Sequence, residues 1–277
     1  MKKENLDPST VISFGDEWAR FDQSSVPEPE LRRFFDEYFF LFPWGRLPVG
    51  AEGFDMGCGS GRWAKLVAPR VGKLHCIDPS GQALEVARQN LRTVLNVELH
   101  HASVDTVPLA PASLDFGYSL GVLHHIPDTQ AAMASCVKLL KPGAPFLVYL
   151  YYRFDNRSPL FRSLWAASDV VRKGISKLPR SIKHRVTDAL AAMVYWPLSR
   201  SARMLERFGF KVKGLPLYAY RHASFYTMRT DSLDRFGTPL EHRFTRAEIT
   251  QMMEKSGLRD VAISPDAPYW CAMGFKA

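Results

Sequence analysis

The stretch EGFDMGCGSGRWA, residues 52–64, constrains the fold more than any other part of the chain. It places an acidic residue, Asp55, before three glycines at alternate positions, Gly57, Gly59 and Gly61. Glycine reaches backbone conformations that other residues avoid, and it lets a ligand approach the main chain closely. The free N–H groups at the start of a following helix also favour an anionic or polar ligand. The stretch therefore predicts a strand, a glycine turn and a helix that together bind a small molecule.

The residues around this turn alternate short apolar runs with helical patterns. Strands are expected at 52–56, 73–77, 97–101, 114–120 and 145–152, and helices at 62–69, 80–94 and 128–140. Strand and helix in alternation indicate βαβ units, which form a parallel sheet with helices on both faces. The first half of the chain is therefore expected to have an α/β fold.

Beyond residue 152 the pattern becomes mainly helical. We expect helices at 158–178, 181–196 and 246–256, a loop at 216–245, and strands at 258–264 and 269–275. Apolar residues at helical spacing support the first two helices, and the second is expected to end before Pro197. The last two strands are expected to return the chain to the sheet.

The net charge of +8 is concentrated in one segment. Between Arg153 and Lys213 there are 14 Lys and Arg against four Asp and Glu, so the rest of the chain is close to neutral. This pattern fits a solvated face on ordinary helices, an anionic acceptor such as a phosphate-bearing sugar or lipid-linked intermediate, or an anionic membrane surface. Nucleic acid ranks lower as a partner, because no recognised RNA-binding module accompanies the sheet.

The cysteines and the apolar runs of the sequence indicate where in the cell the protein is expected. The four cysteines are scattered without a Cys-x-x-Cys pair, which favours buried thiols in a reducing cytosol over a disulfide or zinc framework, and we expect no metal. No secretory signal follows the first lysines, and the strongest apolar runs are too short to cross a bilayer. We therefore expect a cytoplasmic protein, with peripheral contact at the inner membrane face as an option. The oligomeric state is left open.

Two ligands compete for the glycine turn. Residues 59–64 fit the G-x-G-x-x-A form of a dinucleotide fingerprint, which alone is weak evidence. A carboxylate at Asp55, however, would repel a pyrophosphate and attract an ammonium group. Asp78, at the end of the next strand, is placed to accept hydrogen bonds from the ribose hydroxyls of either ligand. S-adenosylmethionine, which has an amine, a ribose and an adenine but no phosphate, suits Asp55 better.

Four phrases within residues 50–152 carry a family resemblance: FDMGCGSGRW, CIDPS, VPLAPASLDFGYSLGVLHHIPD and LLKPGAPFLVYLYY. In this order and spacing they resemble the class I S-adenosylmethionine-dependent methyltransferases. The resemblance implies a Rossmann-like sheet of order 3-2-1-4-5-7-6 with strand 7 antiparallel, and a helical cap inserted after strand 5. It also implies that Asp55 and the glycines bind the methionine half of S-adenosylmethionine, and that Asp78 holds its ribose.

The resemblance divides the chain into three parts. These are an N-terminal helical segment over the cofactor site (1–50), a methyltransferase core (51–152 and 241–277) and a basic helical substrate cap (153–240). The phrase SFGDEWARF, residues 13–21, resembles a segment that folds over the cofactor in some relatives, although an amphipathic surface helix explains it equally well. Trp18 and Arg20 in this phrase are candidate substrate contacts, as are Tyr152, His222 and Tyr226.

One departure from the family concerns the adenine. Relatives often carry an Asp in a GDAxxLP-like phrase that receives the adenine amine. Alignment on Pro108 places Ser103 at that position, with Asp105 two residues later, so either Ser103 substitutes or Asp105 turns inward. The residues expected to contact the cofactor are Asp55, Gly57, Gly59, Gly61, Asp78, Ser80, Ser103, Val104, Asp105 and Leu120.

The catalytic candidates are His124 and His125, in the phrase LGVLHHIPD at the end of the fourth strand. Open α/β sheets hold their ligands at this edge. Methyl transfer from a sulfonium depends mainly on orientation, so a base is optional, but for a hydroxyl acceptor a base helps to remove the proton. The ordinary histidine pKa near 6.5 suits that role. A structural hydrogen bond to the backbone is the competing explanation for each histidine.

The sequence thus predicts a methyltransferase that uses S-adenosylmethionine, without a metal, to methylate a small or lipid- or glycan-linked acceptor at oxygen. A tRNA-modifying methyltransferase is the first alternative, and an NAD-dependent oxidoreductase is the second. A non-catalytic cofactor-binding protein also remains open.

Overall fold

The computed structural model describes residues 4–268 and 270–277, and these residues form two compact units. The first unit comprises the chain up to Gln23 together with Arg33–Arg157 and Leu240–Ala277. The second comprises Ser24–Arg32 and Ser158–Pro239. Tyr269, expected to begin the last strand, lies outside the described residues. Whether the N-terminal segment covers a cofactor and the second unit caps a substrate stays a prediction.

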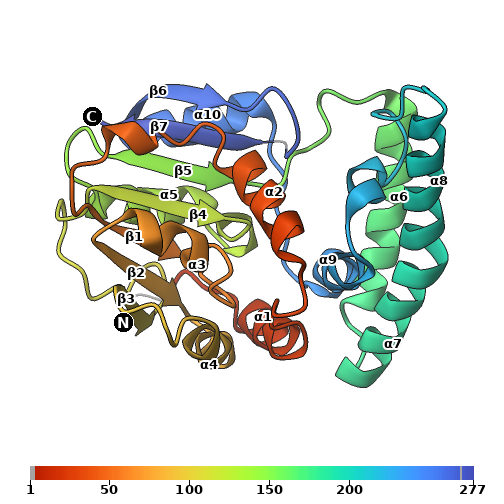
Figure 1. The fold of residues 1–277 in the computed structure, drawn as a ribbon, viewed down its shortest axis with the longest axis horizontal. Helices are drawn as coiled ribbons and strands as arrows, with labels where there is room; N and C mark the ends of the chain where they lie inside the picture. Colours follow the sequence, from red (N-terminus) through yellow and green to blue (C-terminus); the bar gives the residue numbers. More distant parts are fainter. Residues whose placement is uncertain (1–3, 269) are drawn as a thin grey trace. The chain divides into compact units, whose positions relative to one another are not determined.

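The first unit is built on a sheet of seven strands in the order β3-β2-β1-β4-β5-β7-β6, which confirms the predicted fold class (Figure 1). The strands are β1 (Glu52–Met56), β2 (Lys73–Asp78), β3 (Val97–His101), β4 (Phe116–Leu120), β5 (Pro145–Tyr149), β6 (Leu258–Ile263) and β7 (Cys271–Lys276). The first five strands pair in parallel, and β7 is antiparallel to both β5 and β6. Strand β5 is shorter than expected and ends at Tyr149.

The centre of the sheet is buried on both faces, which explains why its strands are apolar along their whole length. In the pairing of strands β1 and β4, an aromatic side chain of each strand packs over a glycine of the other. Gly53 pairs with Phe116 and Phe54 pairs with Gly117, and a Cβ atom on either glycine would collide with the opposite strand's ring. The two glycines therefore provide the space that two large aromatic side chains need in the core.

Six α-helices surround this sheet: α1 (Pro8–Arg20), α2 (Glu28–Tyr38), α3 (Ala64–Val67), α4 (Gly81–Asn90), α5 (Thr129–Leu139) and α10 (Arg246–Lys255). Helix α2 contributes its first residues to the second unit and the rest to the first. Short 3₁₀ turns occupy Trp44–Arg46, Ala68–Arg70 and Leu123–His125. Side-chain caps fix several helix starts, as at Ser80 for α4 and Asp128 for α5. Helices α5 and α10 pack with the sheet face that carries Phe54 and Ile77.

The second unit is helical, with α6 (Pro159–Ile175), α7 (Arg180–Leu190), a π-helical turn (Ala191–Tyr195), α8 (Trp196–Arg207), a 3₁₀ turn (Tyr218–His222) and α9 (Phe225–Gly237). Two expectations were wrong here. The helical segment does not end before Pro197. The π turn shifts the hydrogen-bond register and places Pro197 in the first turn of α8. A backbone N–H in the first turn of a helix makes no hydrogen bond within the helix, so a proline is tolerated there. The expected loop at 216–245 contains α9, which Ser224 caps.

Part of the positive charge of the second unit is used to hold the unit together. Buried Arg172 donates to the carbonyl of Thr238 and pairs with Asp169, and Arg229 binds Asp188 through two hydrogen bonds. Arg162, Lys177 and Arg185, in contrast, are exposed. The basic segment is therefore neither wholly structural nor wholly a surface feature. None of the helices in the described parts of the chain has both the length and the apolar character needed to span a membrane.

Candidate active site

The glycine turn after β1 adopts the conformation that its sequence requires. Gly57, Gly59 and Gly61 all have positive φ, at 80°, 54° and 75°. A Cβ atom on Gly59 would lie 2.8 Å from the indole of Trp18, and one on Gly61 would lie 2.8 Å from Leu91. Both the backbone conformation and the surrounding space therefore exclude larger residues at these positions.

Asp78, at the end of β2, stabilises this turn through two hydrogen bonds to backbone N–H groups. Its Oδ2 atom accepts a hydrogen bond from the Gly59 N–H at 2.9 Å, and its Oδ1 atom accepts one from the Ser80 N–H at 2.8 Å. Burial raises the pKa of Asp78 to about 6, although the two backbone hydrogen bonds oppose the shift. The carboxylate thus orders the turn and stays available for further hydrogen bonds from a ligand.

Asp55, at the carboxyl end of β1, is almost fully buried. Burial raises its pKa to about 7, the Tyr118 phenol opposes this shift, the Asp78 charge adds to it and Arg62 opposes it. Among the residues that the structure describes, the Asp55 Oδ2 atom has no hydrogen-bond partner. A buried carboxylate in this state is a site for a cationic ligand group.

The N-terminal segment lies against the turn. Asn5 exchanges two hydrogen bonds with the backbone of Asp128, which begins α5. Helix α1 then packs against α4, with Gly15 so close to Ser80 that a Cβ atom would lie 2.5 Å from the Ser80 Oγ atom. Trp18, on the same helix, rests on Gly59. Trp18 thus lies beside the glycine turn, and its contact with substrate stays a prediction.

The two candidates for the adenine contact are in different environments. Ser103 is buried, and its hydroxyl lies 3.0 Å from the Thr106 hydroxyl. Asp105 is exposed and accepts hydrogen bonds from the Asn5 N–H at 2.8 Å and from the Ser135 hydroxyl at 3.4 Å. Asp105 thus holds the N-terminal segment, which favours Ser103 as the residue that faces a ligand.

His124 lies at the carboxyl end of β4 and is fully buried. Its ring packs against Tyr151 at a centroid distance of 3.9 Å and against His125 at 4.0 Å. Neither of its ring nitrogens has a hydrogen-bond partner among the described residues. Burial, with the neighbouring charges of His125, Arg243 and His242, holds the pKa of His124 well below its ordinary value of 6.5, so the ring is neutral at neutral pH.

His125 is held differently. Its Nδ1 atom lies 2.7 Å from the carbonyl oxygen of Leu240, so Nδ1 carries the proton and donates it. The ring also meets Phe14 of α1 edge-on at 4.9 Å. His125 therefore has the structural hydrogen bond that the sequence left open for either histidine, and His124 is the better candidate for chemistry.

The structure adds residues to this site that the sequence analysis missed. Tyr149 and Tyr151, on both sides of the end of β5, contact the His124 ring. The His242 N–H donates to the His124 carbonyl at 2.9 Å, and its neighbours Glu241 and Arg243 form a buried ion pair at 2.7 Å. In the sequence, the charged run from Glu241 to Arg243, just before the helix predicted at 246–256, could have indicated these residues.

The remaining predicted residues are placed as follows. Tyr152 packs against Phe154 and Trp270, while its neighbour Tyr151 contacts the histidines. Val104 and Leu120 are buried, the first in the main core cluster. Arg20 is half-buried, with its guanidinium over the Phe21 ring. His222 and Tyr226 belong to the second unit, where His222 pairs with Glu206 at 3.0 Å, so their contact with substrate stays a prediction.

Comparison with known proteins identifies this arrangement. Residues 54–148, from Asp55's strand to the end of β5, match the family described as "Methyltransferase domain". The chain therefore carries a methyltransferase domain at these residues, on a sheet with the strand order expected of class I S-adenosylmethionine-dependent methyltransferases.

Several curated relatives of the chain are named ubiquinone biosynthesis O-methyltransferase. That of Idiomarina loihiensis is 32% identical over 151 residues, which cover 51% of this chain and 61% of that protein. That of Xanthomonas axonopodis pv. citri is 28% identical over 188 residues, covering 66% of this chain and 74% of that protein. The chain thus spans less than two thirds of the first relative's length.

The fold has a counterpart among solved structures. A protein described as a possible exported protein from Bordetella parapertussis is 13% identical, with a TM-score of 0.52 over 88% of this chain and 67% of that one. At this identity the likeness concerns the fold alone.

The residues around the glycine turn fit S-adenosylmethionine, the cofactor that the matching family implies. Asp55 offers a buried carboxylate for the ammonium of the methionine half, the glycine turn admits a ligand to the backbone, and Asp78 offers acceptors for ribose hydroxyls. When bound there, S-adenosylmethionine supplies a methyl group that is already activated by its sulfonium.

The raised pKa of Asp55 predicts that cofactor binding depends on pH. The ammonium of S-adenosylhomocysteine needs Asp55 ionised, and in the free protein this group takes up a proton as the pH falls through about 7. Binding should therefore be strongest above this pH and weaken by about tenfold between about pH 8 and about pH 6. Isothermal titration calorimetry measures the dissociation constants, and a constant affinity over this range would contradict the assignment.

Asp55→Asn should abolish S-adenosylhomocysteine binding and stabilise the free protein. The folded pKa is raised from 3.8 to about 7, so the ionised group destabilises the folded state once the pH exceeds the unfolded value. At about pH 8 the variant should gain up to about 4 kcal/mol in free energy of unfolding, and the gain should shrink as the pH falls below 7. Urea denaturation tests this, with the exposed Asp260→Asn as the unchanged control. A variant less stable than the wild-type protein would show that the buried Asp55 carboxylate does not destabilise the folded state.

Proposed function

We propose that the protein transfers the methyl group of S-adenosylmethionine to a hydroxyl oxygen of a small or lipid-linked acceptor. The observation that carries this proposal is His124, a neutral and fully buried imidazole at the edge of the sheet where the cofactor turn lies. Val122, two residues before it, lies against Gly57 of that turn. A hydrogen-bond acceptor is thus available beside the expected methyl donor, as removal of a hydroxyl proton requires.

The proposed reaction is a single in-line displacement. The acceptor oxygen forms its bond to the methyl carbon as the carbon–sulfur bond breaks, and that electron pair stays on sulfur. The hydroxyl proton passes to a ring nitrogen of His124. Burial, with smaller contributions from His125, Arg243 and His242, lowers the pKa of His124 and makes it a weak base, so an acceptor with an acidic hydroxyl, such as a phenol, is favoured. Tyr149 and Tyr151 supply aromatic surface against which such a ring would pack.

The relatives support transfer to oxygen in general terms, since several of them are named ubiquinone biosynthesis O-methyltransferase. An NAD-dependent oxidoreductase is set aside by the family match and by the buried carboxylate of Asp55. For tRNA as acceptor, no feature of the described residues adds support beyond the positive charge.

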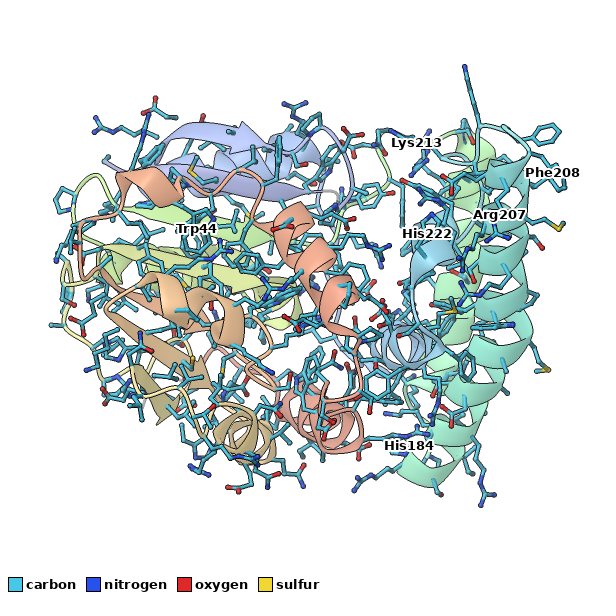
Figure 2. All side chains as sticks on the ribbon, in the orientation of Figure 1. Trp44, His184, Arg207, Phe208, Lys213 and His222 are labelled. Carbon is cyan, nitrogen blue, oxygen red and sulfur yellow. The ribbon has the colours of Figure 1, made fainter. Side chains whose placement is uncertain are left out.

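A surface of the second unit supports a lipid-linked acceptor. Helix α8 and the residues after it expose Met204 (56%), Phe208 (73%) and Phe210 (63%). Arg207 and Lys211 are exposed in the same stretch, and Figure 2 shows Arg207 and Phe208 near the end of α8. We call Met204, Arg207, Phe208, Phe210 and Lys211 the α8 surface. Aromatic and apolar groups beside basic ones match an anionic lipid surface, where apolar burial and charge attraction act together.

The function can be tested through its acceptor and its base. The protein is incubated with labelled S-adenosylmethionine and a metabolite extract, and the product that gains one methyl group identifies the acceptor by mass spectrometry. With that acceptor, His124→Gln should lower kcat by about 10²-fold or more, because proton removal loses its base. The dissociation constant of S-adenosylhomocysteine should change by less than about twofold, since His124 does not hold the cofactor.

His125→Gln is the matched comparison for this test. Its Nδ1 proton donates to Leu240, a role that the glutamine amide can take over, so the loss in kcat should be much smaller. If His124→Gln retains kcat within about threefold, or if the product carries its methyl group on nitrogen or carbon, O-methylation assisted by His124 is excluded.

The α8 surface predicts binding to anionic vesicles. The protein should sediment with vesicles of phosphatidylcholine and phosphatidylglycerol but not with phosphatidylcholine alone, and salt should weaken the binding. The double variant Phe208→Ser, Phe210→Ser should lose most of this binding.

Leu95→Ser is the control, since Leu95 is fully exposed and belongs to the first unit rather than to the basic segment. Equal sedimentation of this variant, the double variant and the wild-type protein with anionic vesicles would remove the membrane from the proposal.

A further inference from the structure

A polar cluster lies near the amino ends of β1, β2 and β3, at the opposite end of these strands from the glycine turn. Glu52, Lys73, His75, Glu98 and His100 form it, and we call them the β2–β3 cluster. Parallel pairing fixes their positions, with Glu52 opposite Lys73 and His75 opposite Glu98. His100 follows Glu98 by two residues, so both side chains lie on the same face of the edge strand.

Three of these side chains bring metal-ligand atoms together. The His75 Nδ1 atom lies 2.8 Å from the His100 Nε2 atom. One oxygen of Glu98 lies 3.7 Å from His75 Nδ1, and the other lies 3.7 Å from His100 Nε2. Ligand atoms of all three residues therefore lie within 4.8 Å of one another. His75 is buried and fixed, while Glu98 is exposed, which leaves an entry path for an ion.

Glu52 sets the tautomer of His75. The His75 Nε2 atom lies 2.7 Å from a Glu52 oxygen, so Nε2 carries the proton and Nδ1 turns its lone pair to His100. A carboxylate behind a histidine in this way is the usual outer partner of a metal-bound imidazole. In the ion-free cluster, the proton on His100 Nε2 fills the gap between the two rings.

We propose that the β2–β3 cluster binds one divalent transition-metal ion, with Zn²⁺ best matched to its donors. His75 Nδ1, His100 Nε2 and a Glu98 oxygen supply two nitrogens and one oxygen, a donor set typical of zinc with water in the fourth position. The ion takes the place of the proton between the rings, and His100 carries its single proton on Nδ1 instead. The two nitrogens move apart from 2.8 Å to about 3.3 Å, a small shift for a ring on an edge strand.

Lys73 is the competitor for this site. Its Nζ atom lies 2.7 Å from a Glu98 oxygen and 3.7 Å from Glu52. This ammonium must leave Glu98 when the ion binds, so the affinity is lower than the three ligands alone would give. Removing the lysine charge should therefore tighten metal binding, an effect that a purely structural hydrogen-bond network would not show.

The test uses the full chain without a purification tag, after removal of metals with a chelator. Titration with Co²⁺ should produce the visible absorption of a tetrahedral ion at one per chain, without the charge-transfer absorption of a thiolate ligand, and Zn²⁺ should displace it. His75→Gln and Glu98→Gln should each weaken Zn²⁺ binding at least about tenfold in competition with a chelating dye. Lys73→Met should tighten it at least about threefold.

Controls separate this site from adventitious binding. His184→Gln, on α7 in the second unit (Figure 2), should keep the wild-type metal affinity. Circular dichroism and S-adenosylhomocysteine binding show that each variant is folded, and neither should depend on the metal. Equal Zn²⁺ affinity in the wild-type protein and His75→Gln, a thiolate signal with Co²⁺, or no gain in Lys73→Met would each overturn the proposal.

Discussion

The burial of two carboxylates at one turn is the constraint on which the rest of the site depends. Asp55 and Asp78 lie within the carboxyl edge of the sheet, and burial raises the pKa of each. Backbone N–H groups compensate Asp78, but the Asp55 Oδ2 atom has no hydrogen-bond partner among the described residues. Above about pH 7 the folded protein therefore carries an electrostatic cost, which a cationic ligand group relieves. The buried Asp55 carboxylate lowers the stability of the ligand-free protein at the position where it would bind the cationic group of a ligand.

The parallel sheet explains how distant parts of the chain meet around that turn. The carboxyl ends of β1, β2, β4 and β5 lie at one edge, so Asp55, Asp78, His124 and Tyr149 lie along the same edge although they are far apart in sequence. The His242 N–H then ties the returning chain to the His124 carbonyl. The cofactor part of the site comes from two adjacent strands, whereas the acceptor part needs three separate segments.

This difference accounts for what the sequence could predict. The sheet order and strands such as β1 and β3 follow from local apolar patterns and family motifs, and both were predicted. The acceptor side depends on contacts that no local pattern encodes. Strand β5 ends at Tyr149, and a hydrogen bond from the distant Phe244 N–H to the Tyr151 carbonyl positions the next residues, so Tyr151 rather than Tyr152 contacts His124.

The errors in the second unit have a similar cause. A proline is a sound signal for a helix end, but a π turn upstream of Pro197 lets the helix continue. The start of α9 carried a local signal in its cap, Ser224, which the aromatic character of the stretch obscured. The orientation of Asp105, in turn, is set by Asn5, a residue 100 positions earlier.

Strand β2 contributes a side chain to each of two polar sites, and the two side chains differ in the charge that they must carry when buried. At its carboxyl end, Asp78 is useful only as an anion, so desolvation works against it and backbone N–H groups must compensate. Near its amino end, His75 is useful as a neutral ring, which tolerates burial, and one hydrogen bond to Glu52 is enough to orient it. A neutral imidazole can therefore be buried with one oriented hydrogen bond, whereas the buried carboxylate of Asp78 accepts two from backbone N–H groups. For this reason the same sheet can hold an independent polar cluster without weakening the site at its other edge.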